Sequence, residues 1–157
     1  MLEAIIIYLN IFLGKLLHAI AGKEIHQWKK QITFLKNLLI ILISLALFYL
    51  SFDLKMIISV VIAFVIFNYF RNIYLSLGLT VFLSMFAAAS ILLLSLILLL
   101  TLIYSSLSKF KTKEIIISTM FFAMPFALLF LETFIKANLS VFTGLAVGSL
   151  LSNIKGP

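Results

Sequence analysis

Several residue types that carry chemistry in other proteins are absent or scarce in this chain of 157 residues. Cysteine is absent, which excludes disulfides, thiolate metal sites and cysteine nucleophiles. Only five residues are acidic, so a catalytic or metal-binding pair of carboxylates is hard to assemble. No HExxH or GxSxG motif occurs. We therefore expect neither an enzyme nor a bound cofactor or metal.

Apolar residues are in large excess. Hydrophobic residues make up 64% of the chain and charged residues 11%, and the mean hydropathy is +1.28. Between Met56 and Leu107 the only formally charged residue is Arg71. Helices that are apolar all round are typical of a lipid environment, whereas a soluble helix needs one apolar face. The composition predicts a single integral membrane domain, residues 1–157, with an all-α, polytopic transmembrane helical bundle.

The apolar runs indicate how the chain would cross a bilayer. They cover about 4–22, 32–50, 56–70, 73–107 and 114–152, separated by polar gaps. The first two runs have the length of single spans, roughly 20 residues. The last two either fold back near 88–90 and near Lys136, giving about seven short spans, or form long tilted or kinked helices around the 108–113 loop. We expect about five to seven membrane segments, some of them short, tilted or kinked.

Charge placement predicts the orientation and the main partner. The net charge of +7 comes from 12 basic and 5 acidic residues, and most lysines lie in short gaps between apolar runs. Such lysines contact anionic headgroups and mark the cytoplasmic side of a membrane, which argues against a nucleic-acid partner. We expect the basic gaps 23–36 and 108–113 and the C-terminus on the cytoplasmic or equivalent organellar side, with Asp53 on the other.

The pattern of segment 23–36 predicts an interfacial helix or an extension of a neighbouring helix. Its expected anchors in the headgroup region are the only tryptophan and two lysines: Trp28, Lys23 and Lys30. His18 and His26 are eight residues apart, which is not a spacing for metal ligands on one helix. His18, with Lys15 one turn before it, is expected to line an internal polar groove.

Polar residues within the apolar runs are the candidate functional positions, because ionisable groups at membrane depth are costly. In one interpretation Arg71 and Glu132 face one another across a hydrated path, and Asn68 and Asn138 supply part of its polar lining. In the second interpretation Arg71 marks a short cytoplasmic turn, and Glu132 forms a helical ion pair with Lys136 four residues later.

Small residues predict where helices approach closely. Ser140, Gly144 and Gly148 recur every four residues, as in a small-xxx-small packing face. The run 87–90 (Ala-Ala-Ala-Ser) is a second such place, and Pro125 should kink the helix that contains it. The glycine pair suggests packing within the chain, or against a second copy or another membrane subunit.

One stretch resembles a known family. Leu131-Glu132 followed by Val141-Phe142-Thr143 resembles the C-terminal helix of ATP synthase subunit a, in which a Leu-Glu pair precedes a glutamine and a Val-Phe-Thr run. The resemblance implies long tilted helices in a hairpin and one essential arginine, a role that would fall on Arg71. The glutamine and the residues expected after the arginine are missing, the Val-Phe-Thr run falls one residue short, and the chain is short for the family.

Three functional hypotheses follow. The first is transport or membership of a membrane protein complex, because the long apolar faces favour helix association. The second is a structural or assembly protein whose polar residues only orient it. The third, from the resemblance, is a proton-channel subunit.

Overall fold

Helices make up all the regular structure in residues 2–70, 72–86, 91–107 and 112–154, the part of the chain that the computed structural model describes. Two long helices come first: α1 (Leu2–Gln27), which bends at Ala21, and α2 (Lys29–Leu50). The elements that follow are α3 (Leu54–Phe70), α4 (Ile73–Ser84), α5 (Ile91–Ser106), α6 (Thr112–Ala123), the 3₁₀ helix η1 (Met124–Leu131), α7 (Glu132–Ala137) and α8 (Leu139–Leu151).

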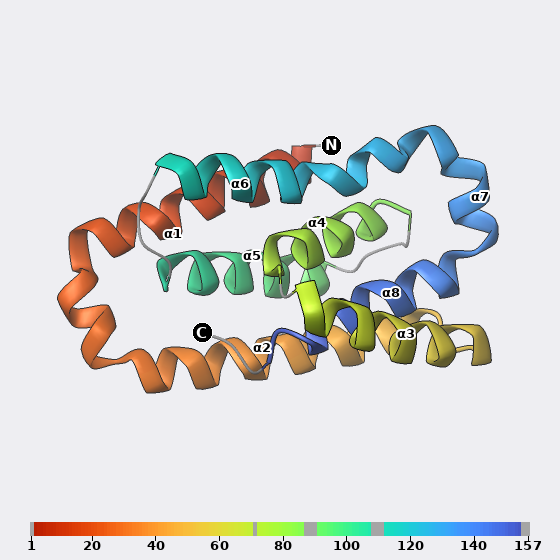
Figure 1. Ribbon diagram of the computed structural model, residues 1–157, viewed down its shortest axis with the longest axis horizontal. Helices are drawn as coiled ribbons and strands as arrows, with labels where there is room; N and C mark the ends of the chain where they lie inside the picture. The colour runs from red at the N-terminus through yellow and green to blue at the C-terminus, as the bar shows by residue number, and fades with distance from the viewer. Residues whose placement is uncertain (1, 71, 87–90, 108–111, 155–157) are drawn as a thin grey trace.

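Helix α4 lies in the interior of the bundle, and α5 has one buried and one exposed face (Figure 1). Helix α4 packs against α6 and α8, and α5 packs against α1 and α2. Ten of the twelve residues of α4 are buried, which fits its apolar sequence without a polar face. Buried hydroxyls on these helices donate to the carbonyl one turn earlier, as Thr80 does to Ser76 (2.8 Å) and Thr101 to Ile97 (2.9 Å). Internal bonds of this kind satisfy polar groups that have no water.

The two long apolar runs are divided into shorter helices. The run 73–107 contains α4 and α5, which run in opposite directions (Figure 1). The run 114–152 contains α6, η1 and α7, then a break at Asn138, after which α8 returns beside α3. The predicted interfacial segment 23–36 is not one helix, because α1 ends at Gln27 and α2 begins at Lys29.

Pro125 lies where α6 gives way to η1. Proline lacks the N–H that a regular helix would use, and its ring clashes with the preceding turn. The chain continues as a 3₁₀ helix of eight residues, longer than most. The distortion expected from the sequence therefore takes the form of a tightened helix.

Gly144 and Gly148 pack against α3 of the same chain. A Cβ atom at Gly144 would lie 2.5 Å from the Met56 carbonyl oxygen, and one at Gly148 would overlap the Val60 carbonyl oxygen. Helices α3 and α8 thus touch backbone to backbone, and within the described part of the chain this is the most extensive contact between two helices. This glycine face is therefore used for packing within the chain.

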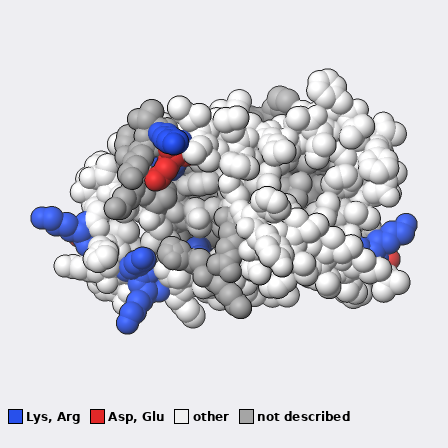
Figure 2. Space-filling model, in the orientation of Figure 1, with Lys and Arg blue, Asp and Glu red and all other residues white. Residues whose placement is uncertain are grey.

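The outer surface is largely apolar. Large hydrophobic side chains are exposed along the outward faces of α1, α2 and α3, for example Leu13, Leu45 and Val61. Figure 2 shows that most of the charged side chains visible on this face lie toward the two ends of the long axis, and that the described residues between them are mostly uncharged. Three helical stretches are long and apolar enough to cross a membrane: Glu3–Gln27, Lys29–Tyr49 and Lys113–Ala137.

Asn72 begins α4 as its N-cap. Its Oδ1 accepts hydrogen bonds from the backbone N–H groups of Tyr74 (3.0 Å) and Leu75 (3.3 Å). We expect Asn72→Ala to lower the free energy of unfolding by about 1–2 kcal/mol, because two N–H groups lose their acceptor. Unfolding in detergent, followed by circular dichroism, measures this. Asn72→Asp keeps the acceptor and should remain close to the wild type; equal losses for both variants would contradict the capping role.

Candidate functional site

The ammonium group of Lys15 is enclosed in the bundle. Only 1% of the residue is exposed. Its Nζ donates to Ser118 Oγ (2.8 Å) and to the carbonyl oxygen of Glu114 (3.1 Å), both on α6, and lies 5.3 Å from the centre of the Tyr74 ring. The Glu114 carboxylate attracts Lys15 electrostatically. However, no carboxylate in the described residues forms an ion pair with Lys15, whose hydrogen-bond partners are neutral.

A second buried lysine lies beyond a pair of tyrosines. Lys36 on α2 is fully buried; its Nζ lies 5.9 Å from the centre of the Tyr104 ring and 3.4 Å from the carbonyl oxygen of Asn153. The rings of Tyr74 and Tyr104 meet edge to face, with centres 5.6 Å apart. Both ammonium groups are therefore close enough to an aromatic ring for cation–π attraction, and the two rings touch.

Hydrogen bonds from the end of α8 close one side of this polar region. The Asn153 Nδ2 donates to the carbonyl oxygen of Ser149 (2.8 Å) and to Ser76 Oγ on α4 (3.3 Å). Ser76 Oγ in turn donates to the Ser149 carbonyl oxygen (3.1 Å). These bonds tie α4 to α8 and place the Asn153 carbonyl beside Lys36.

A cavity of about 240 Å³, here called the inner cavity, adjoins Lys15. Its lining comes from α1, α4, α5, α6 and the cap of α4: Lys15, Asn72, Ile73, Tyr74, Tyr104, Glu114, Ile117 and Ser118. One ammonium, one carboxylate, two phenols and a hydroxyl thus border a single small space. Such a mixture of a few convergent polar groups in an apolar protein is typical of a ligand site.

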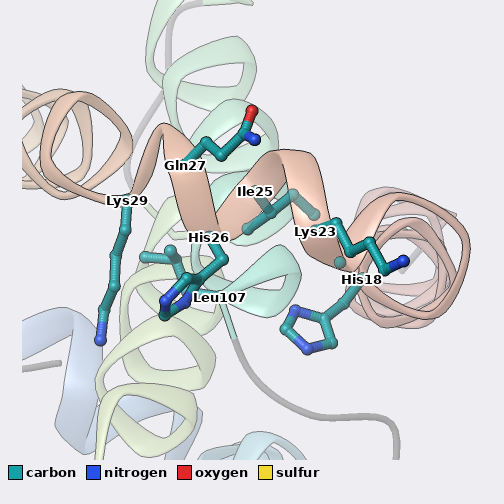
Figure 3. A pocket seen from close by; sticks show the side chains of 8 residues that line it. His18, Lys23, Ile25, His26, Gln27, Lys29 and Leu107 are labelled. Carbon is teal, nitrogen blue, oxygen red and sulfur yellow. The ribbon is translucent and has the colours of Figure 1, made fainter.

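A larger cavity of about 700 Å³, here called the outer cavity, lies at the bend between α1 and α2. It is lined by His18, Gly22, Lys23, Ile25, His26, Gln27, Lys29 and Leu107. Figure 3 shows the rings of His18 and His26 on one side of the α1 ribbon and the Gln27 side chain on the other. The His18 Nδ1 is 2.7 Å from the carbonyl oxygen of Ser106, so α1 and α5 are bridged at this cavity.

The two cavities follow one another along the same pair of helices. On α1, Lys15 lines the inner cavity and His18, one turn later, lines the outer cavity. Tyr104 on α5 lines the inner cavity, and Leu107, directly after the end of α5, lines the outer. One helical turn is about 5.4 Å, so the two spaces are neighbours along the α1–α5 contact. His18 and Lys15, predicted to line one internal groove, thus line two separate neighbouring cavities.

The residues predicted to line a pathway are not brought together around this site. Glu132 forms an ion pair with Lys136 (2.6 Å), and the two side chains are 53% and 59% exposed. Asn68 is exposed on α3, and the Asn138 side chain donates to the Phe134 carbonyl oxygen at the break between α7 and α8. Arg71 and the run 87–90 lie outside the described residues. Ser140 is half-buried at the start of α8.

The predicted anchors lie at the surface. Trp28 separates α1 from α2 and is 59% exposed, and Lys23 and Lys30 are exposed on either side of it. Lys36, at the end of the same predicted segment, is instead buried beside Tyr104.

Sequence reasoning missed most of the inner cavity. Tyr74, Tyr104, Ser118 and Glu114 come from three helices that are distant in sequence, so no local motif joins them. A usable signal was that Lys15 and Lys36 each interrupt an apolar stretch within a helix. An ammonium in that position must reach the surface or find partners inside.

Comparison of this chain with protein families, with curated proteins and with solved structures finds no match. In the stretch that resembles ATP synthase subunit a, the chain breaks at Asn138 between α7 and α8 and is not one continuous helix. The site must therefore be interpreted from its own geometry.

Proposed function

We propose that this chain is a polytopic integral membrane protein. Three stretches are long and apolar enough to cross a bilayer, and α3, α4, α5 and α8 add shorter apolar helices. Their alternating directions in Figure 1 would carry the chain across the bilayer about seven times. The short helix α4 would be enclosed by its neighbours, whereas α3 would present exposed apolar side chains to lipid. The exposed apolar side chains between the charged ends would contact lipid, because a soluble protein rarely exposes apolar surface of this extent.

The distribution of charge supports one orientation. The segments around the α1–α2 bend and the start of α6 include Lys23, Lys29, Lys30 and Lys113 against Glu24 and Glu114. The segments at the opposite end include Lys55 and Lys136 against Asp53 and Glu132. Positive charge in short loops marks the cytoplasmic side. In this proposal the outer cavity opens toward the cytoplasm.

The proposed role is transport of a small solute through the inner cavity. The observation that carries it is the buried ammonium of Lys15, which borders a cavity and has no ion-pair partner in the described chain. A bundle with a purely structural role gains little from such a group, because an apolar side chain of similar size would avoid the cost of burying a charge. The structural or assembly role remains the alternative, and membership of a larger membrane complex is compatible with either.

The topology can be measured directly. We expect a reporter inserted after Asp53 and one inserted after Lys111 to be found on opposite sides of the membrane, with Lys111 on the cytoplasmic side. Glycosylation tags or protease-accessible tags report the side. A reporter at the C-terminus should agree with the one after Lys111. Reporters at Asp53 and Lys111 on the same side would contradict the proposed crossings.

Transport is tested after reconstitution into liposomes loaded with a mixture of small anions, cations and zwitterions. Release of a solute above the level of protein-free liposomes, measured by mass spectrometry, supports the transport role. Lys15→Met should reduce that release, whereas Lys136→Met, at the exposed ion pair, should not. A folded, correctly oriented protein that releases none of these solutes would favour the structural alternative.

A further inference from the structure

We propose that the inner cavity binds a phosphate group through the ammonium of Lys15, and that the ligand enters from the outer cavity. The proposal deepens the proposed function by naming the class of ligand, and its direction of entry rests on the proposed orientation. The phosphate could belong to a small soluble molecule or to a lipid headgroup, since both present the same oxyanion.

The contacts of Lys15 favour an anionic ligand. An ammonium group has three N–H donors; here two are directed to neutral acceptors, Ser118 Oγ and the Glu114 carbonyl oxygen. The remaining contact is the face of Tyr74. An oxyanion in the adjoining cavity would replace a neutral acceptor or the ring by an acceptor of opposite charge, which adds Coulomb attraction to the hydrogen bond.

The neighbouring Glu114 carboxylate does not occupy this position. It borders the cavity and attracts Lys15 electrostatically, but it forms no ion pair with the ammonium. The charge of Lys15 is therefore offset only in part. The N–H groups at the start of α4 are not available for an anion either, because Asn72 Oδ1 accepts from two of them.

The size and polarity of the cavity suit a phosphate. A phosphate group has five heavy atoms and fills roughly the space of two or three waters, each about 30 Å³. The inner cavity of about 240 Å³ therefore has room for the group and a small substituent. Tyr104 is among the lining residues, and a phenol hydroxyl can donate to a phosphate oxygen.

The outer cavity has positively charged residues in its lining, which suit the entry of an anionic ligand. Lys23 and Lys29 line it, with His18 and His26. Clefts lined by one sign of charge attract ligands of the opposite sign and raise their local concentration. His18 is one turn from Lys15, so a ligand attracted to the outer cavity would be next to the inner one.

Binding is measured on the purified full chain in nanodiscs of phosphatidylcholine, which has no net charge. In one arm, inorganic phosphate is titrated and binding is followed by calorimetry. In the other, nanodiscs contain phosphatidic acid, and retained lipid is counted by native mass spectrometry. Lys15→Met removes the ammonium, Lys15→Arg keeps a positive charge, and Lys55→Met is the matched control because Lys55 is exposed at the opposite end.

We expect the wild type and Lys55→Met to bind alike in at least one arm. Lys15→Met should bind about tenfold more weakly or not at all, since it loses the charge-assisted contact. Lys15→Arg should retain part of the affinity. Binding of inorganic phosphate identifies a soluble source, and retention of phosphatidic acid without phosphate binding identifies a lipid source.

Equal binding by the wild type and a folded Lys15→Met protein, or no binding in either arm, would overturn the inference. If Lys15→Met does not fold, Tyr104→Phe is tested in its place, because this variant removes only a phenol hydroxyl. Binding by Tyr104→Phe that equals wild-type binding then counts against the inference. The binding arms do not depend on flux. Phosphate binding without transport would leave the inference standing and refute transport. Transport without binding in either arm would leave the transport role standing and overturn the inference.

Discussion

Gly144→Ala will lower the free energy of unfolding, whereas Gly22→Ala will leave it unchanged or raise it. In an open helical position, alanine is favoured over glycine by about 1 kcal/mol. Gly22 is in such a position, because the nearest atom to an added Cβ is His18 Nε2 at 4.0 Å. The two substitutions add the same methyl group to two helices, so the difference between them reports tertiary packing alone.

At Gly144 the added methyl group has no space. Its Cβ would lie 2.5 Å from the Met56 carbonyl oxygen and 2.7 Å from the Ser59 Cβ, so backbone must move on α3 or α8. Overpacking of this kind costs about 1–3 kcal/mol. We expect a net loss in that range at Gly144 and a comparable loss at Gly148, where the added atom would overlap the Val60 carbonyl oxygen.

Thermal or denaturant unfolding in the same detergent measures these differences. Size-exclusion chromatography of the wild type at several concentrations serves as a second readout. If Gly144→Ala is as stable as the wild type but changes the oligomeric state, the glycine face joins two copies and the α3–α8 contact described here is wrong.

Lys15→Met will be at least as stable as the wild type, whereas Lys15→Ala will be less stable. Methionine fills nearly the same length of unbranched side chain without a buried charge. Replacing buried ionic groups by apolar residues of similar volume is often neutral or stabilising, by about 1–4 kcal/mol in favourable cases. Alanine instead leaves a void, for which a loss of about 2 kcal/mol or more is expected.

The neighbours of Lys15 keep their own partners in both variants. Ser118 Oγ still donates to the carbonyl oxygen of Glu114 (2.6 Å) or of Ile115 (2.9 Å), so removing the ammonium leaves no orphaned hydroxyl. Unfolding midpoints of the three proteins in one detergent give the comparison. A Lys15→Met protein that is destabilised as strongly as Lys15→Ala would assign Lys15 a structural role and remove the main argument for a ligand site.

The apolar runs predicted the helices better than they predicted where the helices end. Asn72 is an example of a local signal, because an asparagine before an apolar stretch can cap the next helix by itself. The division of 114–152 into four helical elements is different. Pro125 accounts for the change to a 3₁₀ helix. The reversal of chain direction at Asn138 instead depends on the packing of α8 against α3.

By itself, the sequence determined the class of structure. It predicts helices with apolar surfaces, because the apolar runs have no polar face, charges are few and most lysines lie in short gaps. These properties are local to each segment, so they can be recognised without the tertiary structure. It also indicated the glycine face of α8, since a repeat of small residues is visible within one helix. Only the tertiary structure decided that this face meets α3 and that Lys15, Tyr74, Tyr104 and Glu114 border one cavity. Those contacts join residues distant in the chain, and no periodicity within a helix specifies which other helix will lie against it.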